Sequence, residues 1–413
     1  PDTLMRISVF HDWGFEGWPV TVDMPPGGPL LLAVDADGKA DRQLEICWAG
    51  GADGSPDSAS LFAVRRDGRG MFGGPHAFAS LDRMPRPLMA ALPIGDALGD
   101  PPDGPSYFSV STFYDASADS VGGTPGGQVW LLDHLGSPRP GWPAALPSAV
   151  TTPPVIAGLY PNAAVYVGCA DARVYKLGLD GAVLWSSPAD LAGGVSGRLA
   201  VWRDPSTGYA LIAAGGVEGD VAVFSDAAAP WPTGGVSLWP RRLAAAGFAP
   251  DFLWIDFDGS GRPAGKGPAC ASGVPALVIR DADRLWAFCP AGAPLGGWGG
   301  SRGDTLVAGL GAGDPDGDGY AEVLIQTIGS QVAFINQSGS PSPGWPRRTT
   351  REGFRTDSPP LALDVDGDVA PEVVALDASG LVAALRGDGR VPAGWPLATG
   401  VGAIGAPVAA DLD

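Results

Sequence analysis

Apolar residues in this chain gather in short runs, mostly of about four to six residues, that are rich in Val, Leu, Ala and aromatic side chains. Gly, Pro and Asp bound each run on both sides, which is typical of strands joined by turns. No stretch has the periodicity of a long amphipathic helix. The pattern therefore predicts an all-β protein made of many short strands.

The clearest internal repeat lies in the last third of the chain. Residues 314–346 and 364–396 share one order of features: an acidic loop, a strand, a turn, a second strand and the tripeptide Gly-Trp-Pro. Weaker copies begin near residues 35, 100, 159, 204 and 256, and residues 411–413 resemble the start of another. The spacing of about 45 to 65 residues is that of a four-stranded propeller blade.

The Gly-Trp-Pro tripeptide marks the outer edge of the predicted sheets. It stands at residues 17–19, 141–143, 344–346 and 394–396, with relatives at 230–232 and 238–240. Proline is tolerated at a sheet edge but not in a central strand, so we place the tripeptide at the outer strand of each unit. Recurrence of the tryptophan at one repeat position predicts packing between units.

Repeated four-stranded antiparallel sheets predict a single β-propeller domain over residues 1–413. Seven blades occupy about residues 29–400, and residues 1–28 provide the last strands of a closing blade. Residues 401–413 would supply its first strand, which makes eight blades; seven blades with frayed ends is the alternative. Because the chain starts at Pro1 and stops at the opening of an acidic loop, we expect the natural polypeptide to be longer.

The two best acidic loops have the spacing Asp-x-Asp-Gly-Asp-x-x-x-Glu, which places carboxylates at positions 1, 3, 5 and 9. Ca²⁺ prefers six to eight oxygen ligands at about 2.3 to 2.6 Å, and converging carboxylates without a cation would repel one another. The predicted ligands are Asp314, Asp316, Asp318 and Glu322 with the carbonyl of Tyr320, and Asp364, Asp366, Asp368 and Glu372 with the carbonyl of Ala370. The alternative, a solvated Asp/Gly turn, does not explain the repeated Glu.

Two further loops match this spacing in part. One keeps Asp256, Asp258 and Ser260 but has Ala264 at position 9. The other has Asp35 and Asp37, with Asp41 as a substitute ligand because Lys39 occupies position 5. The sequence thus predicts two calcium sites and at most four.

These loops resemble the FG-GAP or VCBS-type repeats of integrin α-subunit-like propellers. The resemblance follows the periodic pattern through the whole chain, is sharp only in the units at residues 314 and 364, and extends to Gly405-Ala-Pro407. It implies that the acidic loop joins the first two strands of a blade and binds calcium. It also implies a secreted or surface-exposed protein that binds proteins or glycans, although some related propellers are polysaccharide lyases.

Composition narrows the classes of function. The net charge of −19 and the pI near 4.4 exclude a nucleic-acid binder that depends on phosphate attraction. No run of 18 apolar residues is present to form a membrane-spanning helix. His11, His76 and His134 fall in separate units and no nucleophile motif occurs, so no catalytic residue is predicted.

Cysteines and irregular aromatic residues add weaker signals. Cys270 and Cys289 flank one predicted hairpin and suit an intra-blade disulfide, whereas Cys47 and Cys169 lie in non-adjacent blades and suit buried apolar positions. Aromatic residues outside the repeat pattern are candidates for a binding face: Trp13, Phe15, Tyr160 and Trp254. The arginine pairs at residues 241–242 and 347–348 are expected to form surface ion pairs.

The sequence therefore predicts a secreted, calcium-stabilised propeller that binds a protein or glycan on one face and has no catalysis of its own. Its predicted location is extracellular or at the cell surface, with the periplasm as an alternative. Two other functions stay open: a glycan-active enzyme such as a propeller-type polysaccharide lyase, and a self-assembling subunit of an extracellular filament or surface layer.

Overall fold

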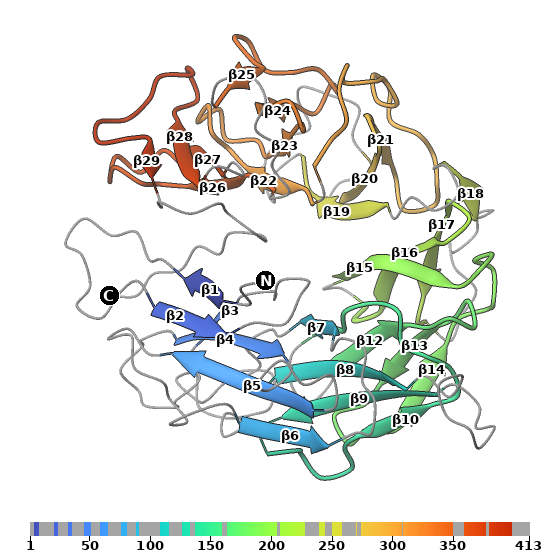
Figure 1. The fold of residues 1–413 in the computed structure, drawn as a ribbon. Coiled ribbons are helices and arrows are strands. Elements are labelled where there is room, and N and C mark those ends of the chain that lie inside the picture. Colours follow the sequence, from blue (N-terminus) through green and yellow to red (C-terminus); the bar gives the residue numbers. More distant parts are fainter. Residues whose placement is uncertain are drawn as a thin grey trace. The chain divides into compact units, whose positions relative to one another are not determined.

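The computed structural model describes side chains between residues 126 and 398, except at 133–136, 159–162, 205–206, 228–238, 244–249, 258–269, 271–273, 308, 350–358 and 377–379, and before residue 126 it describes the backbone of strands β1–β8. All regular elements in these residues are β-strands (Figure 1). The chain divides into two compact units, one of Pro1–Val217 with Ala410–Asp413 and the other of Glu218–Ala409.

The first unit opens with a two-stranded sheet of β1 (Leu4–Ile7) and β2 (Val20–Asp23). Three four-stranded sheets follow. They consist of β3 (Leu32–Val34), β4 (Glu45–Gly50), β5 (Ser58–Val64) and β6 (His76–Ser80); β7 (Leu88–Ala90), β8 (Phe108–Tyr114), β9 (Gly126–Leu132) and β10 (Ala144–Leu146); and β11 (Val155–Ala157), β12 (Ala164–Gly168), β13 (Val174–Leu177) and β14 (Val183–Ser186).

The next sheet contains β15 (Val195–Arg203), β16 (Ala210–Gly216), β17 (Asp220–Ser225) and β18 (Arg241–Arg242). The second unit continues with β19 (Asp251–Ile255), β20 (Ala276–Asp281) and β21 (Arg284–Phe288); β22 (Gly311–Gly313), β23 (Glu322–Gln326), β24 (Gln331–Ile335) and β25 (Arg347–Arg348); and β26 (Leu361–Leu363), β27 (Glu372–Leu376), β28 (Leu381–Leu385) and β29 (Leu397–Ala398).

Strands that are consecutive in sequence lie side by side in each of the described sheets, and they pair antiparallel. This is the strand order of a propeller blade. The predicted fold class, an all-β chain of four-stranded antiparallel blades, is confirmed. Ring closure, one domain over the whole chain and the choice of eight or seven blades stay predictions, and residues 401–413 lie outside the described part.

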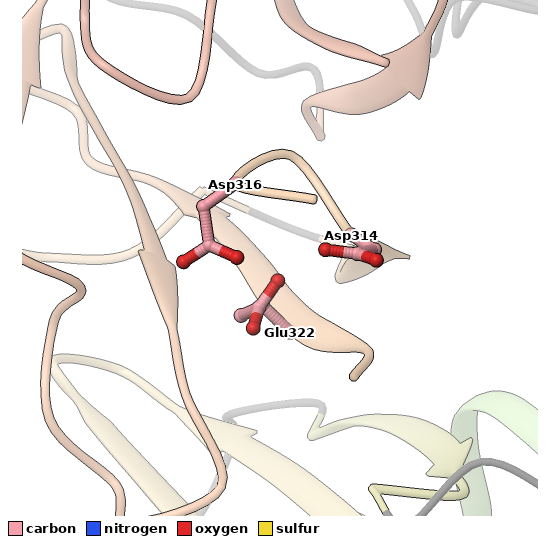
Figure 2. Close-up of side chains that lie close together, drawn as sticks. All are labelled: Asp314, Asp316 and Glu322. Atoms are coloured by element: carbon pink, nitrogen blue, oxygen red, sulfur yellow. The ribbon is translucent and has the colours of Figure 1, made fainter. Parts of the chain in front are cut away.

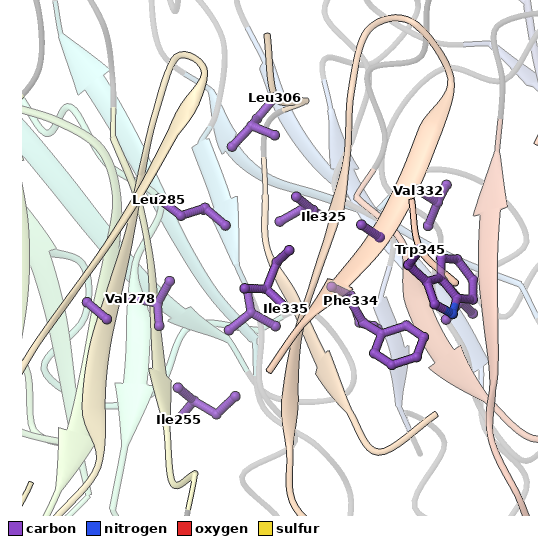
Figure 3. Close-up of a cluster of buried hydrophobic side chains, with 14 of the residues drawn as sticks. Ile255, Val278, Leu285, Leu306, Ile325, Val332, Phe334, Ile335 and Trp345 are labelled. Atoms are coloured by element: carbon purple, nitrogen blue, oxygen red, sulfur yellow. The ribbon is translucent and has the colours of Figure 1, made fainter. Parts of the chain in front are cut away.

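Where side chains are described, the middle strands of the four-stranded sheets are largely buried on both faces, which explains their unbroken apolar runs. Every residue of β20 and β23 is buried, whereas both residues of the outer strand β25 are exposed. In the second unit, apolar side chains from β19 to β28 form one cluster that includes Val278, Ile325 and Phe334 (Figure 3). Full burial of each such side chain stabilises the fold by about 1.5 to 3 kcal/mol.

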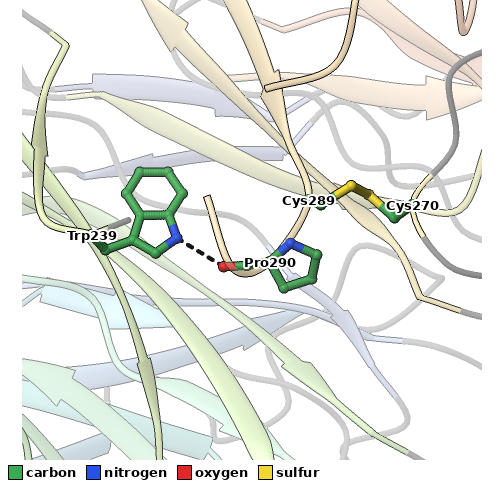
Figure 4. The surroundings of a disulfide bond; sticks show 4 residues. All are labelled: Trp239, Cys270, Cys289 and Pro290. Carbon is green, nitrogen blue, oxygen red and sulfur yellow. Dashed lines mark hydrogen bonds between the residues drawn. A yellow bond between two sulfur atoms is a disulfide. The ribbon is translucent and has the colours of Figure 1, made fainter. Parts of the chain in front are cut away.

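The Gly-Trp-Pro tripeptides stand directly before the outermost strand, as at β10 and β25, and not within it. Two tryptophans of these tripeptides, together with Trp239 of Leu-Trp-Pro and Trp298 of Gly-Trp-Gly, donate hydrogen bonds from their indole Nε1 atoms to the turn after the third strand of the following sheet. The pairs are Trp142 with the carbonyl of Leu179 (2.9 Å), Trp239 with Pro290 (2.8 Å, Figure 4), Trp298 with Gln337 (3.2 Å) and Trp345 with Gly387 (2.9 Å). The predicted packing role of these tryptophans is confirmed.

Candidate metal centres

Both strong acidic loops join the first and second strands of a blade. The first runs from β22 to β23 and the second from β26 to β27. The residue before each loop pairs with the loop's glutamate, Gly313 with Glu322 and Leu363 with Glu372. Strand pairing therefore fixes the last predicted ligand of each loop against the buried core.

Hydrogen bonds inside the first loop wind the chain around its own carboxylates. The amide of Gly319 donates to Oδ2 of Asp314 at 2.8 Å, and the amide of Asp318 donates to Oδ1 of Asp316 at 3.3 Å. Gly317 has a φ of 71°, in the left-handed region that glycine adopts without steric cost. The Gly that follows the second Asp in the motif is thus required by the turn.

Three carboxylates of this loop converge (Figure 2). Oxygen atoms of Asp314, Asp316 and Glu322 lie within 4.8 Å of one another. Glu322 is 1% exposed, and neither of its carboxylate oxygens has a hydrogen-bond partner; the same is true of Oδ1 of Asp314. Buried polar atoms are nearly always satisfied in folded proteins, so these three oxygens are candidate ligands for a cation.

The environment of Glu322 disfavours its negative charge. Burial, followed by the charges of Asp316, Asp318 and Asp314, raises the pKa of Glu322 to about 9. Asp318 is exposed and is not among the three close carboxylates, although its charge still acts on Glu322. A cation at this position would lower the pKa of Glu322 again, because it stabilises the ionised carboxylate.

The second loop has the same winding. Asp364 accepts hydrogen bonds from the amides of Gly367 (2.7 Å) and Val369 (2.8 Å), and Asp368 accepts one from Ala370 (3.0 Å). Backbone donors lower the pKa of Asp364 against the opposing effect of desolvation, while burial raises the pKa of Glu372. Oxygens of Asp364, Asp366 and Glu372 again lie within 4.8 Å of one another.

Arg386 distinguishes the second loop from the first. Its guanidinium forms a hydrogen bond and ion pair with Asp366, and its Nη1 and Nε atoms lie 3.3 Å from Asp368 and 3.8 Å from Glu372. Sequence reasoning missed this residue. The available signal was a basic residue immediately after the third strand of the unit, at the position that Asn336 holds in the preceding copy.

The donor set of the first loop fits a hard divalent cation. All of its predicted side-chain ligand atoms are carboxylate oxygens, the ligands that Ca²⁺ and Mg²⁺ prefer. The unpaired oxygens of Asp314 and Glu322 are the observation that supports a metal there. The carbonyls of Tyr320 and Ala370 stay predicted ligands.

Of the predicted ligands in the weaker acidic loops, one falls within the described residues. Asp256 is half-buried directly after β19, and Asp258 and Ser260 lie outside the described residues. The predicted ligands Asp35, Asp37 and Asp41 also fall outside, between β3 and β4.

Some of the other predicted polar and aromatic residues lie within the described part of the chain, and others lie outside it. Arg242 forms the expected surface ion pair, with Glu218 at 3.6 Å, whereas Arg241 lies over the rings of Trp239 and Phe288. Trp254 is half-buried in β19. Trp13, Phe15, Tyr160, His11 and His134 lie outside the described residues, and His76 is described only as the first residue of β6.

Cys270 and Cys289 form a disulfide, as the sequence suggested (Figure 4). Cys169 is a free, buried thiol, and burial raises its pKa, in agreement with the predicted apolar role. Cys47 lies in β4, where only the backbone is described.

No protein-family model and no curated protein matches the chain. Solved structures align over most of it. The crystal structure of BBS1N in complex with ARL6DN has a TM-score of 0.49 and 11% identity, covering 94% of this chain and 98% of that chain. BamB from Moraxella catarrhalis has a TM-score of 0.47 and 13% identity, covering 99% and 92%. The computationally designed Ika8 protein has a TM-score of 0.47 and 12% identity, covering 93% and 95%. Scores below 0.5 carry no conclusion about activity or partners.

The described residues include no helix with the length and apolar character needed to cross a lipid bilayer.

Proposed function

We propose that this protein is a calcium-stabilised, non-catalytic binding or assembly module that acts outside the cytoplasm on a protein or glycan partner. The observation that supports the calcium site best is Glu322, whose two buried carboxylate oxygens lack hydrogen-bond partners beside Asp314 and Asp316. The loop of residues 364–372 (the 364 loop) repeats the acids of the loop of residues 314–322 (the 314 loop) and is the second proposed site.

Calcium would contribute to stability in two ways. It would neutralise carboxylates that otherwise repel one another at short range. It would also order a nine-residue loop whose backbone entropy opposes folding, so that binding free energy becomes folding free energy. A blade held in this way offers a rigid platform for a partner.

The disulfide between Cys270 and Cys289 supports a location outside the cytoplasm. Disulfides persist in oxidising compartments and are rare in the cytosol. Extracellular calcium modules work with dissociation constants of about 10⁻⁴ to 10⁻³ M, which suits loops of this kind.

Thermal unfolding in calcium, magnesium and EDTA tests the proposal. We expect calcium to raise the melting temperature of the wild type and to have much less effect on E322Q. D180N is the matched control, because Asp180 is an acidic residue in an exposed turn, where its carboxylate accepts a hydrogen bond from the amide of Ala182. Equal melting temperatures in calcium and EDTA would contradict the proposed calcium site.

The binding role needs its own test. Glycan arrays and affinity capture from culture fluid, each in calcium and in EDTA, should reveal a partner that the calcium-loaded protein retains. Incubation with acidic polysaccharides tests the enzymatic alternative. Progressive depolymerisation by the purified protein would replace the binding role with that of a lyase.

A further inference from the structure

The two acidic loops differ at one equivalent position on the neighbouring strand. Val323 pairs with Ile335 in one blade and Val373 pairs with Leu385 in the other. The next residues, Asn336 and Arg386, therefore hold the same place beside Glu322 and Glu372. Their backbones also close the same turn: the amide of Asn336 donates to Ser340 and the amide of Arg386 donates to Arg390.

Arg386 turns its side chain into the acidic loop of its own blade. Its guanidinium contacts Asp366, Asp368 and Glu372 at once, and Glu372 is 1% exposed. A guanidinium offers five donors in a planar fork that matches carboxylate geometry. The positive charge of Arg386 thus already lies among the carboxylates that would bind a metal ion.

In the described part of the chain, the side chain of Asn336 forms hydrogen bonds within its own turn and not with the acidic loop of its blade. Its Oδ1 accepts hydrogen bonds from Oγ of Ser338 (2.6 Å) and from the amides of Ser338 (3.0 Å) and Ser340 (3.4 Å). This side chain is used within its own turn. In the part of the chain with described side chains, Glu322 correspondingly keeps two buried oxygens without a hydrogen-bond partner.

We infer that the Arg386 guanidinium neutralises the carboxylates of the 364 loop in place of a metal ion, so that this loop binds calcium at least tenfold more weakly than the 314 loop. The inference rests on the proposed calcium function and refines it. A guanidinium and a divalent cation cannot share the same carboxylate oxygens without repulsion at close range, so calcium enters the 364 loop only when Arg386 withdraws. The acid spacing alone does not distinguish the two loops.

A reciprocal exchange of the two residues in the full chain tests this inference by isothermal titration with Ca²⁺. In the wild type, E322Q should remove the tightest of the sites that the two loops provide, and E372Q should leave that site unchanged. R386N should tighten binding at the 364 loop at least tenfold, and E372Q introduced on that background should abolish the gain. N336R should weaken binding at the 314 loop at least tenfold.

Two further variants serve as controls. R390N removes a positive charge four residues away that pairs with Asp388 on the surface, and should leave both affinities unchanged. R386K keeps a positive charge and should keep the 364 loop weak. If R386N does not fold, N336R tests the same idea in the other blade.

The possible failures are distinguishable. Two wild-type sites of equal affinity, one lost in E322Q and one in E372Q, with no change in R386N, would overturn the inference and leave the proposed calcium function standing. No calcium binding by the wild type or any variant would overturn both.

Discussion

The indole Nε1 of Trp345 donates a 2.9 Å hydrogen bond to the carbonyl oxygen of Gly387, 42 positions along the chain in the following sheet. Trp345 also packs against Phe334, with ring centroids 4.7 Å apart and ring planes tilted by 58°. The same kind of hydrogen bond recurs at Trp142, Trp239 and Trp298. Trp142 and Trp345 are buried in the core, whereas Trp239 and Trp298 are half-buried. Each of the four joins its sheet to the next through the hydrogen bond of its indole nitrogen.

Replacing this tryptophan separates the two contributions. W345F keeps an aromatic ring but leaves the Gly387 carbonyl without its donor, so we expect a loss of about 1 to 3 kcal/mol in the free energy of unfolding. W345A also opens a cavity and should cost about 3 to 5 kcal/mol. Urea unfolding measures both. W185F, at a half-buried position in the outer strand β14, should change stability far less.

Glu322 should make the stability of the calcium-free protein depend on pH. Its pKa is raised from 4.5 in the unfolded chain to about 9 in the fold. Between these values the folded protein holds a proton that the unfolded chain has lost, so the free energy of unfolding falls as pH rises, by at most about 1.4 kcal/mol per pH unit. Calcium should remove this dependence because it keeps the carboxylate ionised.

E322Q checks the sign of that effect. Glutamine has nearly the same shape but cannot ionise, so in EDTA at pH 8 the variant should be more stable than the wild type. In saturating calcium the order should reverse, since the variant has lost a ligand. Denaturant titrations from pH 5 to pH 9 measure both; a wild type that is more stable than E322Q at every pH in EDTA would contradict this account.

The buried pair of Arg280 and Asp251 should be sensitive to loss of one partner. Nε and Nη2 of Arg280 lie 2.7 and 2.5 Å from Oδ2 of Asp251, and the side chains are 6% and 13% exposed. R280M leaves the carboxylate buried without its cation and should cost about 3 to 5 kcal/mol in chemical denaturation. The exposed pair of Arg390 and Asp388 is the control, and R390M should cost less than about 1 kcal/mol.

Loss of the disulfide should destabilise the blade formed by β19–β21. Cys270 and Cys289 are 19 residues apart, and closing a loop of about this length is worth about 3 kcal/mol through the unfolded chain. We expect dithiothreitol to lower the urea midpoint of the wild type and to leave C270S/C289S unchanged. An equal response of both proteins would show that the reductant acts elsewhere.

Much of the blade pattern is local, and the sequence predicts it well. Acidic loop, strand, turn and strand follow one another between residues 314 and 335, so composition and turn residues place β23 and β24 within a residue or two. The position of Trp345 was less well predicted, because it precedes the outer strand and does not belong to it. The boundaries of a strand depend on its pairing with a neighbouring strand, and the local sequence does not specify that pairing.

The sequence by itself determined the all-β class, the repeated blades and the acid spacing of both loops, because each depends on residues close together in the chain. Only the tertiary structure decided how the two loops differ. Arg386 reaches Asp366 across 20 positions, while Asn336 is held in its own turn by Ser338. The side chain at the end of the adjacent strand decides whether a protein cation already pairs with the carboxylates of the loop. The residues of the loop itself do not determine which side chain lies there.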